Sequence, residues 1–208
     1  MRVGNAPPYW DEAKDFLRKI DPVISDLIDC YEHPNLVSRG DIFYTLARSI
    51  VGQQISSKAA ESIWSRIEEK AGKIGPESMI FMGHDELREC GLSNRKAEYI
   101  IGASESWSSD YSNESLGGMS DGEVVQVLTS LRGVGTWTAE MILIFSLLRS
   151  DVFPMADIGV IRAMEKLYNQ GRRMEKEDIS SISGSWRPFR TVATWYLWRS
   201  MDSEPVLY

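Results

Sequence analysis

Apolar residues recur along most of the chain at intervals of three and four positions, the spacing of amphipathic helices that bury one face. One such stripe consists of Val23, Ile24, Leu27, Ile28 and Tyr31. The sequence has no convincing run of strict apolar–polar alternation, which is the pattern of a half-buried strand. We therefore expect an all-α fold.

Polar residues that favour helix N-termini predict where several of these helices begin. They precede five of the apolar stripes, at Asp21, Asp41, Ser93, Ser120 and Asp157. Pro22 strengthens the first signal, and Glu123 completes a capping box with Ser120. The predicted helices cover about residues 22–31, 41–52, 57–71, 77–82, 84–90, 93–101, 121–131, 137–148, 157–167 and 188–200. The segment 104–118, rich in serine and glycine, predicts a surface connection.

Composition narrows the class of protein. The 208 residues are 43% hydrophobic and 25% charged, which suits one or two ordinary globular cores. Two cysteines and two histidines provide neither a disulfide framework nor the repeated spacing of a zinc site. No segment approaches the ~20 uncharged apolar residues of a membrane span, and the start lacks a signal peptide. We expect a soluble protein in the cytoplasm and nucleoid of a prokaryote, or in the nucleus of a eukaryote.

The net charge of −7 and the pI near 5.0 oppose nucleic-acid binding, because duplex affinity usually comes from cations that neutralise phosphates. Much of the acid, however, lies in the N-terminal fifth of the chain. Residues 184–201 contain Arg187, Arg190 and Arg199 and no acidic residue. This segment can supply a local cationic face, with weak and salt-sensitive binding.

A glycine-containing turn at 131–139, Leu-Arg-Gly-Val-Gly-Thr-Trp-Thr-Ala, joins two predicted helices. Gly133 and Gly135 permit positive φ and place no side chain between the backbone amides and a ligand. At the N-terminus of the helix that begins at Trp137, those amides can bind a phosphate without a lysine. An isolated Gly-x-Gly is more often a tight turn between packed helices, so its surroundings decide between the two interpretations.

Those surroundings resemble a known family. Segment 131–139 is similar to the helix-hairpin-helix of the HhH-GPD superfamily of DNA glycosylases, and 151–157 matches the loop and aspartate that follow it there. Three more segments resemble the 3-methyladenine DNA glycosylase II branch: 50–56, 91–97 and 186–190, the last followed by Trp195 and Trp198. The likeness covers roughly 35–201, with its segments in the order of the family.

The resemblance implies one glycosylase unit over residues 1–208, built as two helical lobes with the active-site cleft between them. The lobe at about 40–145 would carry the wedge loop and the helix-hairpin-helix (124–148). Residues 1–39 with 146–208 would form the second lobe. The implied partner is double-stranded DNA with an alkylated base, bound by a monomer.

Asp157 is the catalytic carboxylate that the resemblance implies. Aspartate before Ile-Gly-Val-Ile is also a good helix N-cap, and the two roles can coexist. Trp137 stands where bifunctional members have a Schiff-base lysine, so water is the implied nucleophile and strand cleavage is not expected. Two cysteines cannot hold the four-cysteine iron–sulfur cluster that many of those members carry.

Family position also implies the remaining site residues. The base pocket would comprise Trp137, Met141 and Trp198, with Met141 where a relative has tyrosine. Gln54 would be the wedge, flanked by Gln53 and Ile55, although a polar helix C-terminus explains these residues equally well. The hairpin residues that contact DNA would be Arg132, Gly133, Val134, Gly135, Thr136 and Thr138. Carbonyls of Thr129, Leu131 and Val134 could bind a structural Na⁺ or K⁺, the one cofactor expected.

The implied activity is hydrolysis of the N-glycosidic bond of alkylated purines, of the 3-methyladenine and 7-methylguanine type, in base excision repair. Three alternatives stay open. One is a non-catalytic helix-hairpin-helix module that only binds DNA. Another is a glycosylase of the same fold for mismatched or oxidised bases. The third is an all-α scaffold with no nucleic-acid partner, which the acidic pI would suit.

Overall fold

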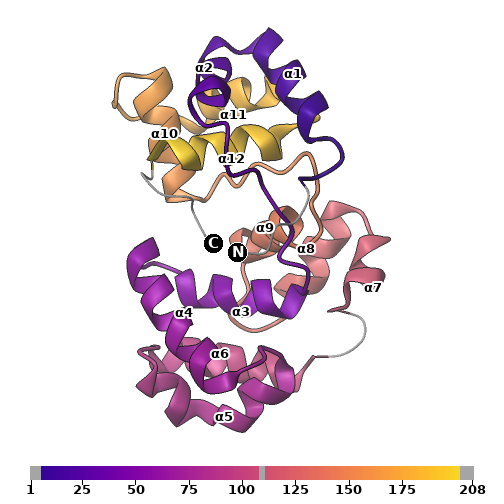
Figure 1. Cartoon of the computed structure of the whole chain (residues 1–208), viewed down its shortest axis with the longest axis vertical. Coiled ribbons are helices and arrows are strands. Elements are labelled where there is room, and N and C mark those ends of the chain that lie inside the picture. The colour runs from indigo at the N-terminus through magenta and orange to yellow at the C-terminus, as the bar shows by residue number, and fades with distance from the viewer. Residues whose placement is uncertain (1–5, 108–110, 202–208) are drawn as a thin grey trace. The chain divides into compact units, whose positions relative to one another are not determined.

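The computed structural model describes residues 6–107 and 111–201, and within these ranges it contains helices and no strand. The all-α prediction is thus confirmed. The chain forms two compact units, coloured along the sequence in Figure 1. The terminal unit comprises residues 6–38 and 148–201, and the central unit comprises residues 39–147. The boundaries between these units, at 38/39 and 147/148, lie within two residues of the boundaries expected for the two lobes. The active-site cleft between the lobes stays a prediction.

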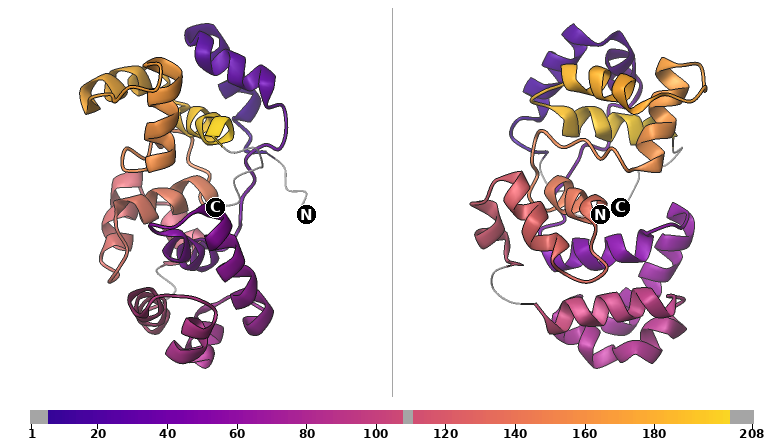
Figure 2. Two further views of the ribbon diagram at one scale, coloured as in Figure 1. Left: turned by 90° about the vertical axis from the view of Figure 1, so that its left-hand side faces the viewer. Right: turned by 180° about the vertical axis from the view of Figure 1, so that it is seen from behind.

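The terminal unit is built around its last helix. Its helices are α1 (Trp10–Ile20), α2 (Pro22–Cys30), α10 (Ile158–Tyr168), α11 (Lys176–Ser185) and α12 (Arg190–Met201). Nine consecutive residues of α12, from Thr191 to Arg199, are buried. The reason is that α12 packs against α1, α2 and α10 (Figures 1 and 2).

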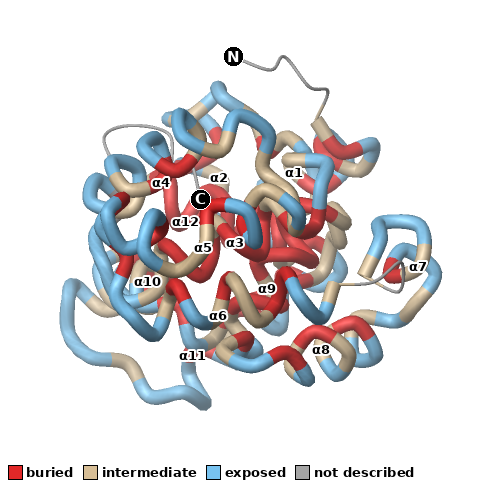
Figure 3. The backbone as a smooth tube through the Cα atoms, turned by 90° about the horizontal axis from the view of Figure 1, so that it is seen from below, coloured by how far each residue is buried: buried red, intermediate tan, exposed pale blue. Residues whose placement is uncertain are grey.

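The central unit has its core between α3 and α9. Its helices are α3 (Ile42–Gly52), α4 (Ser57–Ala71), α5 (Pro76–Glu89), α6 (Asn94–Glu105), α7 (Asn113–Gly117), α8 (Asp121–Thr129) and α9 (Thr136–Phe145). Every residue of α9 from Met141 to Phe145 is buried, and Figure 3 shows this helix largely in the buried colour. α9 packs against α3 and α8, which places the α8–α9 turn beside the end of α3.

The predicted caps form hydrogen bonds as expected. Asp41 accepts from the amide of Tyr44, and Ser120 and Glu123 form the reciprocal capping box. The predicted break between residues 82 and 84 is Gly83, whose φ of 69° interrupts α5. No helix in the described part of the chain is long and apolar enough to cross a membrane.

Some elements differ from the predictions. The supposed connection 104–118 contains α7, capped by Ser112. α9 ends at Phe145 rather than 148, because the amide of Leu147 reaches back to Ile142 and Leu148 adopts φ of 51°. Two helices of the structure, α1 and α11, are not among those predicted from the sequence.

Candidate active site

Asp157 combines burial with a fixed orientation. Its side chain caps α10, and the residue is 6% exposed. Oδ1 accepts hydrogen bonds from the amide of Val160 at 2.8 Å and from Nε1 of Trp198 at 3.0 Å. Trp198 lies on α12 and is 1% exposed. The packing of α10 on α12 therefore holds this carboxylate in one orientation before any substrate arrives.

Gly159 lies close to both members of this pair. A Cβ added to Gly159 would lie 3.1 Å from Oδ1 of Asp157 and 3.5 Å from Cδ1 of Trp198. The first distance is tighter than most Cβ contacts, so the carboxylate would have to shift by a few tenths of an ångström, whereas the second is an ordinary contact. Glycine at this second position of α10 thus leaves room for the carboxylate of Asp157 to contact the indole of Trp198.

A second buried aspartate in the terminal unit serves as a contrast. Oδ1 of Asp21 accepts the amides of Val23 and Ile24 at the start of α2. Oδ2 accepts the hydroxyl of Tyr168 and Nε1 of Trp186, each at 2.8 Å. These four donors come from three separate segments and satisfy the buried carboxylate, so we assign Asp21 a structural role. The bond from Tyr168 also anchors the C-terminal end of α10, opposite Asp157.

The two glycines of the α8–α9 turn adopt different backbone conformations. Gly133 has φ of +87°, and a Cβ there would lie 2.2 Å from the ring of Tyr99, so both backbone and packing require glycine. Gly135 has φ of −99° and is the N-cap of α9, so only Gly133 uses the positive φ that glycine permits. Nothing lies within 4 Å of a Cβ added to Gly135, which is exposed. Glycine at 135 therefore leaves the surface over the first amides of α9 uncovered.

The loop after α3 is attached to this turn. Nε2 of Gln53 donates to the carbonyl of Gly133 at 3.3 Å and to Oγ1 of Thr138 at 3.1 Å. Nζ of Lys96 donates to the carbonyls of Val51 and Gln53 at 2.8 and 2.7 Å, and burial lowers the pKa of Lys96. Gln53 thus fastens the loop to the turn, a role that its position in the sequence does not reveal.

The neighbouring residues of this loop face outward. Gln54 is exposed with φ of +57°, and Ile55 is 39% exposed. Either side chain is therefore accessible to a ligand that approaches the hairpin. Their part as a wedge stays a prediction.

Comparisons with known proteins decide the family. The family model for the HhH-GPD superfamily base excision DNA repair proteins matches residues 47–188, which include the hairpin and Asp157. The chain belongs to this superfamily. DNA-3-methyladenine glycosylase 1 of Schizosaccharomyces pombe is 31% identical over 84% of this chain and 78% of its own length. A putative DNA-3-methyladenine glycosylase of Bacillus subtilis is 30% identical, and the chain spans 61% of its length.

A solved structure agrees with these relatives. The S. pombe 3-methyladenine DNA glycosylase in complex with abasic DNA has a TM-score of 0.83 and 31% identity, covering 91% of this chain and 96% of that one. The resemblance to the 3-methyladenine branch of the HhH-GPD superfamily is therefore confirmed.

In this HhH-GPD protein, the three expected base-pocket residues are divided between the units. Trp137 and Met141 lie one turn apart on α9 in the central unit, where Met141 is 1% exposed. Trp198 lies in the terminal unit and contacts Asp157. A pocket formed by all three stays a prediction. Four of the remaining tryptophans are buried in the two units: Trp10, Trp64, Trp186 and Trp195.

The three arginines that could form a cationic face at 184–201 are only partly available. Nη1 of Arg187 and Nε of Arg190 bond to the carboxylate of Asp151 at 2.7 and 2.6 Å. Arg199 is 8% exposed, lies over the ring of Tyr31 and donates to a backbone carbonyl. The segment itself has no acidic residue, but the fold brings an aspartate from outside the segment to two of its three arginines.

Proposed function

We propose that this protein is a monofunctional DNA glycosylase that hydrolyses the N-glycosidic bond of alkylated purines in duplex DNA. The observation that carries the proposal is the buried carboxylate of Asp157, held through Oδ1 by Val160 and Trp198. The names of its relatives support the substrate class, 3-methyladenine and related purines.

The chemistry follows from charge. As the bond between C1′ and the base nitrogen breaks, its electron pair leaves with the base, and positive charge develops on the sugar. The carboxylate of Asp157 stabilises that charge, and its preset orientation avoids reorganisation during the reaction. Water adds to C1′ and gives up a proton, for which Asp157 is the proposed acceptor. An N3- or N7-alkylated purine is cationic and leaves as a neutral base, so one carboxylate suffices.

The other predicted residues would bind the DNA around this reaction. The first amides of α9, at Gly135 and Thr136, suit a phosphate. Gln54 or Ile55 would fill the space left by the extruded nucleotide. Trp137 and Trp198 would hold the cationic base by cation–π attraction, worth ~0.5–2 kcal/mol per ring.

Trp137 determines the proposed product. An indole cannot form the Schiff base that the lysine of bifunctional relatives forms, so the product would be an abasic site in an intact strand. The hairpin carbonyls of Thr129, Leu131 and Val134 would hold a monovalent cation. Neutral oxygen donors suit an alkali cation, and the carbonyl of Leu131, which accepts the amide of Val134 at 3.1 Å, keeps a second lone pair for it.

Incubation of the purified protein with methylated duplex DNA tests the proposal. We expect chromatography to show free 3-methyladenine or 7-methylguanine, with strands that stay intact until alkali is added. Retention of the duplex without base release would favour the non-catalytic DNA-binding module. Strand breaks without alkali would contradict monofunctional action.

A further inference from the structure

The outer face of α10 presents an unusual set of residues beside the candidate active site. Ile158, Arg162 and Lys166 recur every four positions, so they lie on one face of the helix. All three are exposed, Ile158 by 66%, whereas Val160, Ala163 and Met164 on the opposite side are buried. The exposed face begins at the residue after Asp157.

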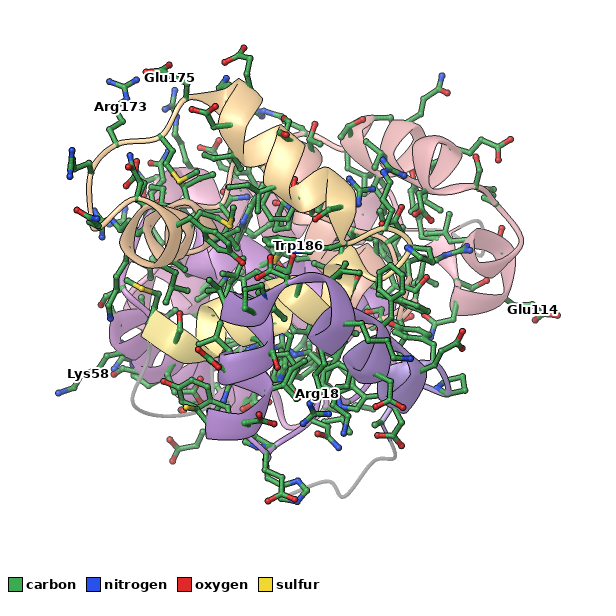
Figure 4. The ribbon with its side chains drawn as sticks, turned by 90° about the horizontal axis from the view of Figure 1, so that it is seen from above. Arg18, Lys58, Glu114, Arg173, Glu175 and Trp186 are labelled. Atoms are coloured by element: carbon green, nitrogen blue, oxygen red, sulfur yellow. The ribbon has the colours of Figure 1, made fainter. Side chains whose placement is uncertain are left out.

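Both cations on this face keep their charge unneutralised. Within the ranges that the structure describes, no carboxylate forms an ion pair with Arg162 or Lys166. Glu165, the acid of α10, accepts the amide of Met174 instead. The following loop carries mixed charge, since Arg173 and Glu175 both project from it (Figure 4). The loop also contains Arg172, so it adds to the positive charge of the helix face.

Several cations near the proposed DNA-binding residues are already engaged, although Lys58 and Arg95 are exposed and form no ion pair within the described ranges. Arg132 of the hairpin lies 3.5 Å from Glu98, and Lys96 donates to two backbone carbonyls. Arg187 and Arg190 share Asp151. In a chain with a net charge of −7, the part of phosphate affinity that comes from side-chain charge depends on cations that its own acids leave unneutralised.

We propose that Ile158, Arg162 and Lys166, which we call the α10 ladder, bind the backbone of the DNA strand that carries the damaged nucleotide. Arg162 and Lys166 contact phosphates, and Ile158 packs against a deoxyribose beside Asp157. Four residues of α-helix advance ~6 Å, and one strand carries a charge every ~3.4 Å of duplex axis, so the two cations can serve phosphates one or two nucleotides apart. The choice of strand rests on the proposed function of Asp157.

The salt dependence of duplex binding tests the ladder. The probe is a duplex with a stable abasic-site analogue, titrated with wild type and with the double variant Arg162→Gln/Lys166→Gln at 50 to 200 mM salt. Each lost phosphate contact removes about 0.9 from the slope of log K against log salt, so we expect the slope to shrink by about 1.8. The variant Ile158→Ser is expected to weaken binding with the wild-type slope, because it removes an apolar contact and no charge.

The matched control is Lys19→Gln/Lys73→Gln, which removes two exposed cations from other surfaces and is expected to keep the wild-type slope. A ladder variant with the wild-type slope overturns the proposal, and so do equal changes in both double variants, which would reflect net charge alone. Wild type that binds but releases no methylated base contradicts the role of Asp157 and leaves the ladder standing. Wild type that does not bind duplex DNA overturns both.

Discussion

The carboxylates of Asp157 and Asp21 differ in the number and origin of their hydrogen-bond donors. Both are buried N-caps, and both accept an indole N–H, from Trp198 and Trp186 respectively. Asp21 joins three segments through four donors, whereas Asp157 is held by donors to Oδ1 beside the small residue Gly159. The sequence predicts each cap from its neighbours, but the pairing of Asp157 with a tryptophan 41 residues away depends on helix packing.

Replacing Trp198 by Phe separates orientation of the carboxylate from stacking on the base. A hydrogen bond to a charged group contributes ~1.5–3 kcal/mol, so we expect the single-turnover rate of base release to fall about tenfold or more. Affinity for the substrate duplex should change by less than about threefold, because the phenyl ring keeps the aromatic surface.

Trp186→Phe is the matched control, since it removes the indole donor to Asp21. It should lower the melting temperature and spare the single-turnover rate. A Trp198→Phe variant that loses only stability, as this control does, would contradict the orienting role.

At the scale of elements, local signals predict helix starts better than helix ends. The caps at Asp41, Ser93 and Ser120 are local hydrogen bonds that the sequence displays directly. The end of α9 depends on a left-handed leucine, Leu148, which carries no turn signal. The conformation of the hairpin is predicted only in part, because Tyr99, a residue from another helix, is what crowds Gly133.

The two hairpin glycines should respond differently to alanine. Gly133→Ala introduces a strained φ, costing about 1–3 kcal/mol, and a clash with Tyr99, so urea unfolding should show a clear loss of stability. Gly135→Ala meets no neighbouring atom, and the poorer N-cap should cost about 1 kcal/mol or less. Its methyl group would nevertheless stand over the amides proposed to bind phosphate, so duplex affinity should fall. Unchanged affinity in a folded Gly135→Ala protein would count against the phosphate site.

At the scale of the whole molecule, the composition gives the number of charged side chains. It does not show which of them form ion pairs in the folded chain. Segment 184–201 has three arginines and no acidic residue, but the fold brings Asp151 to two of these arginines. The family motifs, in contrast, lie in continuous stretches, so they imply the fold and make Asp157 the predicted catalytic residue before any coordinates exist.

Alkaline pH should weaken the terminal unit. Burial raises the pKa of three of its tyrosines, Tyr9, Tyr168 and Tyr196, the last to about 12. An unfolded tyrosine titrates near ~10, so above that pH the unfolded chain loses protons that the folded chain keeps, and the free energy of unfolding falls. Urea unfolding from pH 8 to 11.5 should show this decline, with a shallower slope in Tyr168→Phe. Stability that is constant across this window would contradict the effect.

The most direct test of the account is single-turnover release of methylated purine by Asp157→Asn. Asparagine caps a helix as well as aspartate does, so the fold should persist while charge stabilisation is lost. We predict a rate at least about 100-fold below wild type, at unchanged thermal stability. Asp41→Asn makes the same substitution at the exposed cap of α3 and should keep the wild-type rate. A folded Asp157→Asn protein that releases bases as fast as wild type would contradict the central claim.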